Sequence, residues 1–429
     1  MDIHKPIKEN SYAIYGLGLS GTSALKFLKK KKVKRIYIWD DKKKIKIKKN
    51  LDFFKAKLNE VDYIVISPGI NIKKTKFKSI LFKNKKKIIT DLDLFYMQKL
   101  DVKSIMVTGT NGKSTTCKLI QHVLKTNKID AQLGGNIGKP ILDVKINKKS
   151  IIVIEASSFQ LSYLKFIKPT FAMILNISKD HLDWHGTIRH YEDSKFNIFN
   201  NQDKQDQALL NKEEHIQRFK RKLFKSKLIK ISERILKKSF KQKILNKYLL
   251  SKPNLENVFF VYKLSTILKI KKNIILKALN SFKGLAHRNE VFYSKQEIVF
   301  VNDSKATSFD ATQHALKNYK NIFWIVGGLP KLGDKFKLQG VKKNIIKSYI
   351  VGNNINHFKK QIGKIVEYKC SNTLKMALQD IIKDLLLLKQ KQATVLLSPA
   401  SASYDQFNNF VERGNYFKKL IFKYARKFL

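Results

Sequence analysis

The stretch from Ile105 to Thr116 limits the fold of this chain more than any other feature. It reads Ile-Met-Val-Thr-Gly-Thr-Asn-Gly-Lys-Ser-Thr-Thr, an apolar run followed by small residues and then by a segment with helical periodicity. This order predicts a strand, a phosphate-binding loop and a helix, because backbone N–H groups at a helix start can bind a polyphosphate. We expect Lys113 to reach the terminal phosphates and the Ser114 hydroxyl to ligate Mg²⁺. The loop is a shortened variant, since Val107 stands where the strict Walker pattern has glycine.

Composition limits the class of protein. With 429 residues, of which 43% are hydrophobic, the chain is long enough for about three domains with cores of their own. No apolar run approaches the ~18 residues that cross a bilayer, and the N-terminus lacks the apolar segment of a signal peptide. The two cysteines, Cys117 and Cys370, do not make a disulfide framework. We therefore expect a cytoplasmic protein without a membrane span.

The formal net charge of +54 suggests a nucleic acid as partner. The lysines are, however, spread along the whole chain rather than gathered in one stripe. We interpret the charge as a solvated basic surface that suits anionic substrates, and we expect no nucleic-acid partner. The alternative is an ATPase that binds nucleic acid, which predicts ATP hydrolysis stimulated by DNA or RNA.

The N-terminal part carries a second nucleotide-binding pattern. The motif G-x-G-x-x-G at residues 16–21 follows an apolar run, and Asp40 ends the next predicted strand. This spacing is typical of a Rossmann-like βαβ unit, although the same geometry serves any nucleotide diphosphate. A third strand, 63–66, leads to Ser67. Taken alone, the pattern leaves an NAD enzyme open, which predicts hydride exchange without ATP.

The part after the phosphate loop supplies candidate metal ligands. A predicted strand at 151–154 ends in Glu155, where a carboxylate can hold Mg²⁺ directly or through water. The strand at 171–176 leads to His181, which we expect to be a metal or phosphate ligand. Residues 203–247 are polar and lysine-rich, and we interpret them as surface strands and helices without chemistry.

The remaining sequence predicts one long helix and a further α/β segment. The helix spans 249–268 and carries Asn254 and Asn257; asparagine can bind an adenine edge, but Asn254 suits a helix cap equally well. After Gly284, strands are predicted at 298–301, 323–326, 348–351 and 394–397. Polar loops follow these strands, and a helix is expected from about Asp405.

Together, the motifs resemble the Mur ligases of bacterial cell-wall synthesis over residues 16–410. Folylpolyglutamate synthases share the phosphate loop more loosely. Two stretches, 302–307 and 398–410, indicate the D-glutamate-adding branch, and the Asn-Pro-Arg motif of the diaminopimelate- or lysine-adding branch is absent. The resemblance implies an α/β fold of three domains. These are an N-terminal Rossmann-like UDP-sugar-binding domain (1–91), a central P-loop ATPase-like domain (92–284) and a C-terminal Rossmann-like amino-acid-binding domain (285–429).

The resemblance also implies an activity. It is that of an ATP-dependent acid–amino-acid ligase that adds D-glutamate to UDP-N-acetylmuramoyl-L-alanine through an acyl phosphate, in peptidoglycan precursor synthesis. ATP and Mg²⁺ would be required, and the protein is expected to be a monomer. Another Mur-type or a folylpolyglutamate-type amino-acid ligase is the alternative.

Single residues take roles from the same resemblance. ATP would contact the phosphate loop and three later residues: Gly109, Thr110, Asn111, Gly112, Lys113, Ser114, Thr115, Asn257, Arg288 and Asp303. The UDP substrate would contact Ser20, Asp40, Ser67, Asn136, Ser157 and Gln160. The amino acid would contact Lys305, Thr307, Lys331, Ser403, Tyr404 and Phe410.

The catalytic and metal-binding residues overlap. The resemblance assigns catalysis to Lys113, Glu155, His181 and Lys195, and the metal to Ser114, Glu155, His181 and Lys195. Lys195 aligns with the lysine that is carbamylated in the family. A carbamate would turn this amine into an anionic oxygen donor of the kind that Mg²⁺ prefers.

Overall fold

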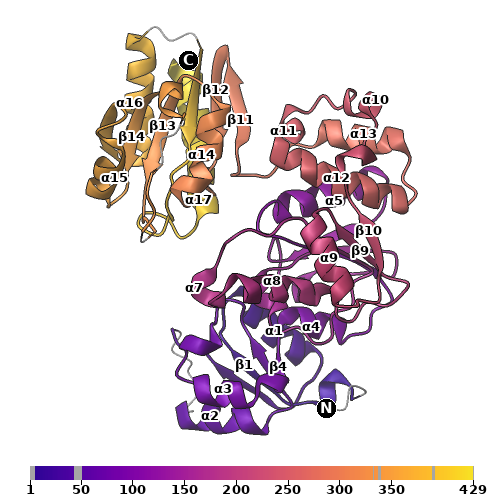
Figure 1. Cartoon of the computed structure of the whole chain (residues 1–429). Coiled ribbons are helices and arrows are strands. Elements are labelled where there is room, and N and C mark those ends of the chain that lie inside the picture. Colours follow the sequence, from indigo (N-terminus) through magenta and orange to yellow (C-terminus); the bar gives the residue numbers. More distant parts are fainter. Residues whose placement is uncertain (1–4, 43–50, 332, 337–339, 389–391, 429) are drawn as a thin grey trace. The chain divides into compact units, whose positions relative to one another are not determined.

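The computed structural model describes residues 5–42, 51–331, 333–336, 340–388 and 392–428. The chain divides into two compact units, Met1–Phe282 and Lys283–Leu429, hereafter the first and the second unit (Figure 1). The first unit contains two sheets and the second contains one, so the predicted three-domain α/β fold is confirmed. The predicted domain boundaries stay a prediction; they are 1–91, 92–284 and 285–429.

The N-terminal sheet is parallel, with the strand order β2-β1-β3-β4. Its strands are β1 (Tyr12–Tyr15), β2 (Ile36–Trp39), β3 (Tyr63–Ile66) and β4 (Ile88–Ile89). Its helices are α1 (Leu19–Lys30), α2 (Leu51–Glu60) and α3 (Lys78–Lys83). All residues of β1 and β3 are buried, as expected for central strands of a parallel sheet covered on both faces.

The central sheet has the order β10-β9-β8-β5-β7-β6, and all its strands are parallel. They are β5 (Lys103–Thr108), β6 (Ala131–Gly135), β7 (Ile151–Glu155), β8 (Phe171–Ile174), β9 (Gln207–Leu210) and β10 (Lys227–Lys230). The phosphate loop follows β5, which pairs with β7 and β8. This position places the loop at the carboxyl edge of the sheet, where α/β proteins bind ligands.

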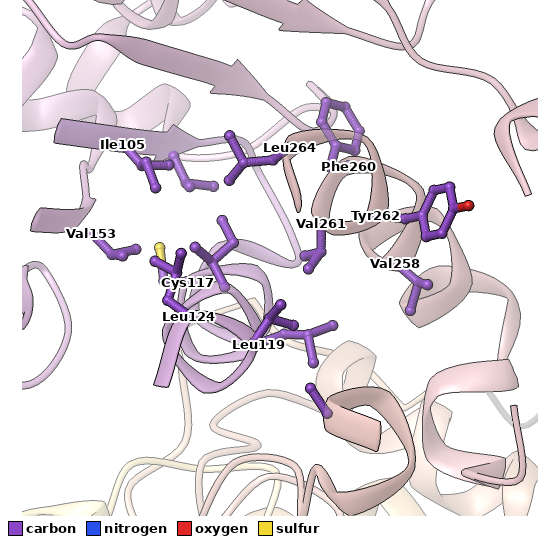
Figure 2. Packing of buried hydrophobic residues seen from close by; sticks show 14 of the residues in the cluster. Ile105, Cys117, Leu119, Leu124, Val153, Val258, Phe260, Val261, Tyr262 and Leu264 are labelled. Atoms are coloured by element: carbon purple, nitrogen blue, oxygen red, sulfur yellow. The ribbon is translucent and has the colours of Figure 1, made fainter. Parts of the chain in front are cut away.

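One helix layer of the first unit packs around the helix that follows the phosphate loop. This helix, α5 (Lys113–Thr126), contacts α12 (Lys252–Ile267) and α13 (Lys272–Ser281). The predicted apolar face of α5 is buried, and Figure 2 shows Leu119 on the side of α5 that faces Val261 of α12. Tertiary contacts of this kind, more than propensity, stabilise such helices.

The shorter helices of the first unit connect its strands or follow the last of them. They are α4 (Asp91–Tyr96), α6 (Ser158–Leu161), α7 (Leu182–His185), α8 (Ile188–Phe196), α9 (Glu213–Arg221), α10 (Lys238–Lys241) and α11 (Lys247–Leu250). Single 3₁₀ turns occur at Ile7–Glu9, Ile72–Lys74, Lys85–Lys87, Ile141–Asp143, Asn197–Phe199, Glu233–Ile235 and, in the second unit, Lys342–Asn344.

The interpretation of residues 203–247 as surface structure is wrong for β9. This strand lies inside the central sheet between β8 and β10, and Ala208, Leu209 and Leu210 are fully buried. Lysines and other polar residues on both sides make the stretch as a whole look like surface structure. The burial of this short strand depends on its neighbours in the sheet, so the local sequence does not reveal it.

The second unit contains a mixed sheet with the order β11-β12-β16-β13-β14-β15. Its strands are β11 (Glu290–Lys295), β12 (Glu297–Asn302), β13 (Ile322–Gly327), β14 (Ile345–Val351), β15 (Tyr368–Asn372) and β16 (Gln392–Leu397). Its helices are α14 (Phe309–Asn318), α15 (Ile355–Ile362), α16 (Leu374–Leu387) and α17 (Phe410–Phe428). Among the strands that the structure describes here, β11 alone is antiparallel to its neighbour.

The four strands predicted for this unit are confirmed, but the edge strands β11 and β15 were not predicted. The last helix begins at Phe410 and not near Asp405. The side chain of Asn409 accepts a hydrogen bond from the Glu412 N–H at 2.9 Å, which caps the helix at this later position. Among the described residues, no helix is long and apolar enough to cross a membrane.

Candidate functional site

Backbone geometry explains the glycines of the phosphate loop. Gly112 caps α5 in the left-handed region, with φ 83°, and a Cβ there would collide with the side-chain amide of Asn257 on α12. The predicted adenine contact Asn257 is thus buried directly against the phosphate loop. The loop is held by Asn176, whose backbone and side-chain oxygens accept the N–H groups of Thr110 and Asn111 at 2.8 Å.

The first three N–H groups of α5 point out of the helix start. A helix leaves these donors without partners of its own, so those of Lys113, Ser114 and Thr115 suit phosphate oxygens. Ser114 and Thr115 are buried at this end of the helix. This arrangement fits the predicted phosphate loop, and phosphate binding by these residues stays a prediction.

Two lysines converge on one carbonyl oxygen of the loop. Lys113 Nζ donates to the oxygens of Gly109 and Thr110, both at 2.7 Å. Lys195 Nζ, from α8, donates to the same Gly109 oxygen at 2.8 Å and lies 4.5 Å from the centre of the Tyr191 ring. Only 1% of Lys195 is exposed. Burial, and then the charge of Lys113, hold the pKa of the Lys195 amine well below its usual range.

Glu155 ends β7 with one oxygen paired and one unpaired. Its Oε1 accepts from Asn136 Nδ2 at 2.8 Å, while Oε2 is buried and has no hydrogen-bond partner within the described residues. A buried carboxylate oxygen without a donor is costly unless a cation approaches it. Glu155 and the buried Ser114 therefore fit a hard cation such as Mg²⁺.

His181 follows the same sheet edge, beyond β8. It caps α7 in the left-handed region, with φ 51°, and its ring centre lies 4.7 Å from that of Phe159. Partial burial lowers the pKa of His181, although the charges of Asp180 and Asp183 oppose the shift. A neutral imidazole can ligate a metal. In the described ranges, no three His, Cys, Asp or Glu side chains form a metal-binding group. The predicted metal ligands include only two residues of these types, Glu155 and His181.

Three of the six predicted UDP-substrate contacts, Ser20, Asp40 and Ser67, lie in or beside the glycine motif after β1. Asp40 Oδ2 accepts the Leu17 N–H at 2.6 Å, and Ser67 Oγ donates to the Gly16 oxygen at 2.8 Å. Both side chains thus hold the glycine loop in shape. A nucleotide-binding role for either of them stays a prediction.

A buried carboxyl joins two other predicted substrate contacts. Asp91 Oδ1 accepts from Gln160 Nε2 at 3.0 Å, and the Ser20 side chain is near enough to the same carboxyl to oppose the rise of its pKa, so an N-terminal and a central residue lie close together. Burial raises the pKa of Asp91, and its Oδ2 has no hydrogen-bond partner in the described part of the chain. Ser157 and Gln160 also form a capping box at α6. The sequence alone does not single out Asp91, because its partners lie far away along the chain.

In the second unit, Asp303 directly follows β12. Its Oδ1 accepts the Asn289 N–H at 3.0 Å and its Oδ2 accepts from Ser398 Oγ at 2.7 Å. Burial raises the pKa of Asp303 to about 7, although both hydrogen bonds and the charge of Arg288 oppose the shift. The carboxyl therefore fixes the start of the loop that also carries Lys305 and Thr307.

The predicted amino-acid contacts lie on neighbouring loops of the second unit. Lys305 Nζ is 5.3 Å from the centre of the Phe410 ring, so these two are brought together. Leu329 and Ala402 exchange backbone hydrogen bonds at 2.9 and 3.0 Å, which pairs the loop before Lys331 with the loop before Ser403. The remaining members differ in burial. Ser403 is buried, Thr307 is half-buried, and Lys331 and Tyr404 are exposed.

Comparison with known families agrees with this geometry. Residues 107–275 match the model of the Mur ligase middle domain, and residues 10–89 match that of the Mur ligase MurD-like N-terminal domain. A UDP-N-acetylmuramoylalanine--D-glutamate ligase of Rickettsia felis is 33% identical over 95% of this chain and 96% of the relative. The ligase of that name from Aquifex aeolicus is 34% identical over 96% and 98%. This chain belongs to the UDP-N-acetylmuramoylalanine--D-glutamate ligase family of Mur ligases.

Solved structures of more distant Mur ligases share the fold. A MurF ligase from Thermotoga maritima in complex with ADP has a TM-score of 0.56 at 15% identity, covering 100% of this chain and 99% of that one. A MurC from the same organism has a TM-score of 0.55 at 14% identity, covering 97% and 100%. At this identity the likeness concerns the fold alone.

Three residues at the candidate sites of the two units were missed from the sequence. They are Asn176, which holds the phosphate loop, Asp91, which joins two predicted substrate contacts, and Arg413, which is buried beneath the loops of the second unit. Only Asn176 had a local signal, since it stands at the end of a predicted strand beside the phosphate loop.

Proposed function

We propose that this Mur ligase joins D-glutamate to the alanine carboxyl of UDP-N-acetylmuramoyl-alanine, with ATP converted to ADP, in peptidoglycan precursor synthesis. The full-length similarity to ligases of that name carries the assignment. The phosphate loop with Lys113 and the paired loops of the second unit support it. The alternatives of a nucleic-acid-dependent ATPase and of an NAD enzyme do not account for these loops.

ATP is required because a carboxylate does not condense with an amine in water unaided. Transfer of the γ-phosphoryl group to the alanine carboxylate would yield an acyl phosphate, which the amine of D-glutamate attacks, with phosphate as the leaving group. Charge builds up on the transferred group, and Lys113 is positioned by the Gly109 and Thr110 oxygens to stabilise it. Stabilisation of this kind contributes a few kcal/mol for each group.

The residues around the loop also fit Mg²⁺, which would supply charge neutralisation on the phosphates. Ser114, Glu155 and His181 are the proposed ligands from the chain. The unpaired Oε2 of Glu155 supports this assignment most directly, because it is buried without a donor among the described residues.

Lys195 is proposed to complete the set as a carbamate. Carbon dioxide adds only to a neutral amine, forming the N–C bond and releasing one proton. The buried Lys195 amine, with its lowered pKa, meets this requirement. The carbamate would be an anion beside the Lys113 ammonium, whereas a second ammonium there would repel it.

The amino-acid pocket is proposed on the second unit. Lys305, Lys331, Thr307 and Ser403 would bind the carboxylates of D-glutamate by charge-assisted hydrogen bonds, with Phe410 and the Tyr404 backbone beside them. Arg288 and Asp303 would contact the adenosine of ATP, as would Asn257 of the first unit. A cytoplasmic monomer remains the expectation.

Phosphate release tests the proposal. The full chain is incubated with UDP-N-acetylmuramoyl-alanine, ATP and Mg²⁺, and each of several amino acids is added in turn. We expect release with D-glutamate, and formation of the amide product by mass spectrometry. Incorporation of L-lysine or meso-diaminopimelate instead would place the chain on another branch. Phosphate release that depends on added DNA or RNA would contradict the ligase assignment and favour the nucleic-acid-dependent ATPase.

A further inference from the structure

Arg413 is a buried arginine whose hydrogen bonds go to a hydroxyl and two carbonyls rather than to a carboxylate. Its Nε donates to Ser304 Oγ at 3.0 Å. Its Nη2 donates to the backbone oxygens of Ser304 at 2.8 Å and Ser401 at 2.9 Å. Only 2% of the residue is exposed, and its Nη1 has no hydrogen-bond partner among the described residues.

This position is unfavourable for a cation. Burial lowers the pKa of Arg413 to about 10, which leaves the guanidinium charged at neutral pH. Arg413 also lies in the first turn of α17, a helix of 19 residues, where the helix dipole disfavours positive charge. An apolar side chain would avoid both costs. Helix packing alone therefore does not explain an arginine at this place.

The guanidinium hydrogen-bonds two loops and lies against a third, and these three loops follow neighbouring parallel strands. Ser304 lies after β12, Ser401 after β16 and Gly328 after β13, in the strand order β12-β16-β13. A Cβ on Gly328, which has φ 133°, would lie 3.2 Å from Arg413 Nη1 and 2.5 Å from both the Ala402 oxygen and Ser401 Oγ. The Nη1 edge thus rests against the backbone of the third loop, which leaves no room for a side chain there.

Each of these loops carries a proposed amino-acid contact close to its junction with Arg413. Lys305 follows Ser304 directly, Ser403 comes two residues after Ser401, and Lys331 comes three residues after Gly328. The pairing of Leu329 with Ala402 ties two of the loops together. Ser304 Oγ also donates to the Phe410 oxygen at 2.8 Å, which joins the remaining loop to the helix start.

We propose that Arg413 is a positioning residue for the amino-acid pocket. Its planar guanidinium holds the loops after β12, β13 and β16 at fixed spacing, so that Lys305, Lys331 and Ser403 face one dicarboxylate ligand. Arg413 acts through these residues and does not touch the ligand, because its nitrogens are buried beneath the loops. The inference rests on the proposed function, in which D-glutamate is that ligand.

The test is Arg413→Lys in the full chain. Lysine keeps the positive charge but lacks the fork that reaches Ser304 and Ser401 together. With ATP and UDP-N-acetylmuramoyl-alanine saturating, the KM for D-glutamate is expected to rise by about tenfold or more, while the KM for the UDP substrate changes less than about twofold. Circular dichroism and the thermal midpoint establish that the variant is folded.

Two further variants separate positioning from loss of fold. Ser304→Ala removes the hydroxyl acceptor of Arg413 and leaves its two carbonyl acceptors in place. This variant is therefore expected to raise the KM for D-glutamate by a smaller factor than Arg413→Lys. If Arg413→Lys does not fold, Ser304→Ala provides the test. Lys418→Ala is the matched control on the same helix. It removes the ion pair with Glu290 and is expected to lower the thermal midpoint without changing the KM for D-glutamate.

Three results would overturn the inference. They are an unchanged KM for D-glutamate in the folded Arg413→Lys or Ser304→Ala variant, an equal rise in both KM values, and a rise in Lys418→Ala as large as in Arg413→Lys. Failure of the proposed function is distinguishable, because the wild-type chain would then not use D-glutamate at all.

Discussion

Lys113 and Lys195 donate hydrogen bonds to the same acceptor, the carbonyl oxygen of Gly109, at 2.7 and 2.8 Å. Two ammonium groups this close repel each other, and the deeply buried one loses hydration as well. Lys195 is the buried partner, with 1% exposure, and its pKa is accordingly held well below the usual range. This arrangement fits the proposed roles of Lys113 as the cation for phosphate and of Lys195 as the amine that carries the carbamate.

The first prediction concerns this reactive amine. Lys195→Ala should lower the ligation rate on the order of 100-fold, because the variant lacks the proposed anionic oxygen donor for the metal. Short-chain carboxylates such as acetate should restore part of the rate by occupying the vacated oxygen position. Steady-state phosphate release with and without acetate measures both effects.

Lys113→Ala is the matched control for rescue. It should be at least as inactive and remain folded, but acetate should not help, because the missing group is a cation. The exposed Lys222→Ala, which loses only an ion pair with Asp193, should keep its activity. A fully active Lys195→Ala variant, or equal rescue of both inactive variants, would return Lys195 to a purely structural role.

A second prediction concerns the N-terminal glycine loop. Asp40→Ala should weaken binding of the UDP substrate by roughly tenfold, because the charged acceptor that holds the Leu17 N–H is removed. Affinity for ATP, whose phosphate loop follows β5, should not change. Calorimetric titration with each ligand measures the two constants. An unaltered UDP-substrate affinity, or competition by NADH, would reject this assignment.

A third prediction follows from the pKa of Asp303, which burial raises to about 7. Between about pH 4 and pH 7 the unfolded chain gives up this proton while the folded chain keeps it. Stability present at acidic pH is therefore lost as the pH rises through this window. Asp303→Asn, which cannot ionise, should flatten that dependence.

The measurement is the thermal midpoint of the full chain at about pH 5 and pH 8, with and without Asp303→Asn. The wild type should lose more stability over this interval than the variant. Asn289 and Ser398 can still hydrogen-bond an amide at this position, so the variant should fold. Parallel pH profiles of the two proteins would show that Asp303 keeps an ordinary pKa.

The fourth prediction concerns ligand charge in the second unit. Lys331→Ala should raise the KM for D-glutamate by roughly 10- to 100-fold, because a charge-assisted hydrogen bond to a carboxylate is lost. The KM for ATP should stay near its wild-type value. Lys335→Ala, also exposed and four residues further along, is the control and should have no effect. A rise in the KM for ATP alone would move Lys331 to the nucleotide site.

Local patterns account for the elements that the sequence predicted well. The phosphate loop and α5 follow from a β-branched run, small residues and an apolar face of helical period, all within a few residues of each other. Four strands of the second unit follow in the same way. The elements that the sequence did not predict depend on contacts between distant parts of the chain. Strand β9 is short and lies among lysines, and its burial depends on β8 and β10 beside it.

By itself, the sequence determined the strand, glycine-rich loop and helix around Lys113, the glycine motif after β1, four strands of the second unit, and the family. Only the tertiary structure decided that Lys195 meets the Gly109 oxygen across 86 residues, that Asp91 joins Ser20 to Gln160, and that Arg413 lies beneath three loops. The reason is physical. Turn chemistry and periodicity act between near neighbours along the chain, whereas burial, pKa shifts and hydrogen bonds between distant segments exist only once the strands have paired.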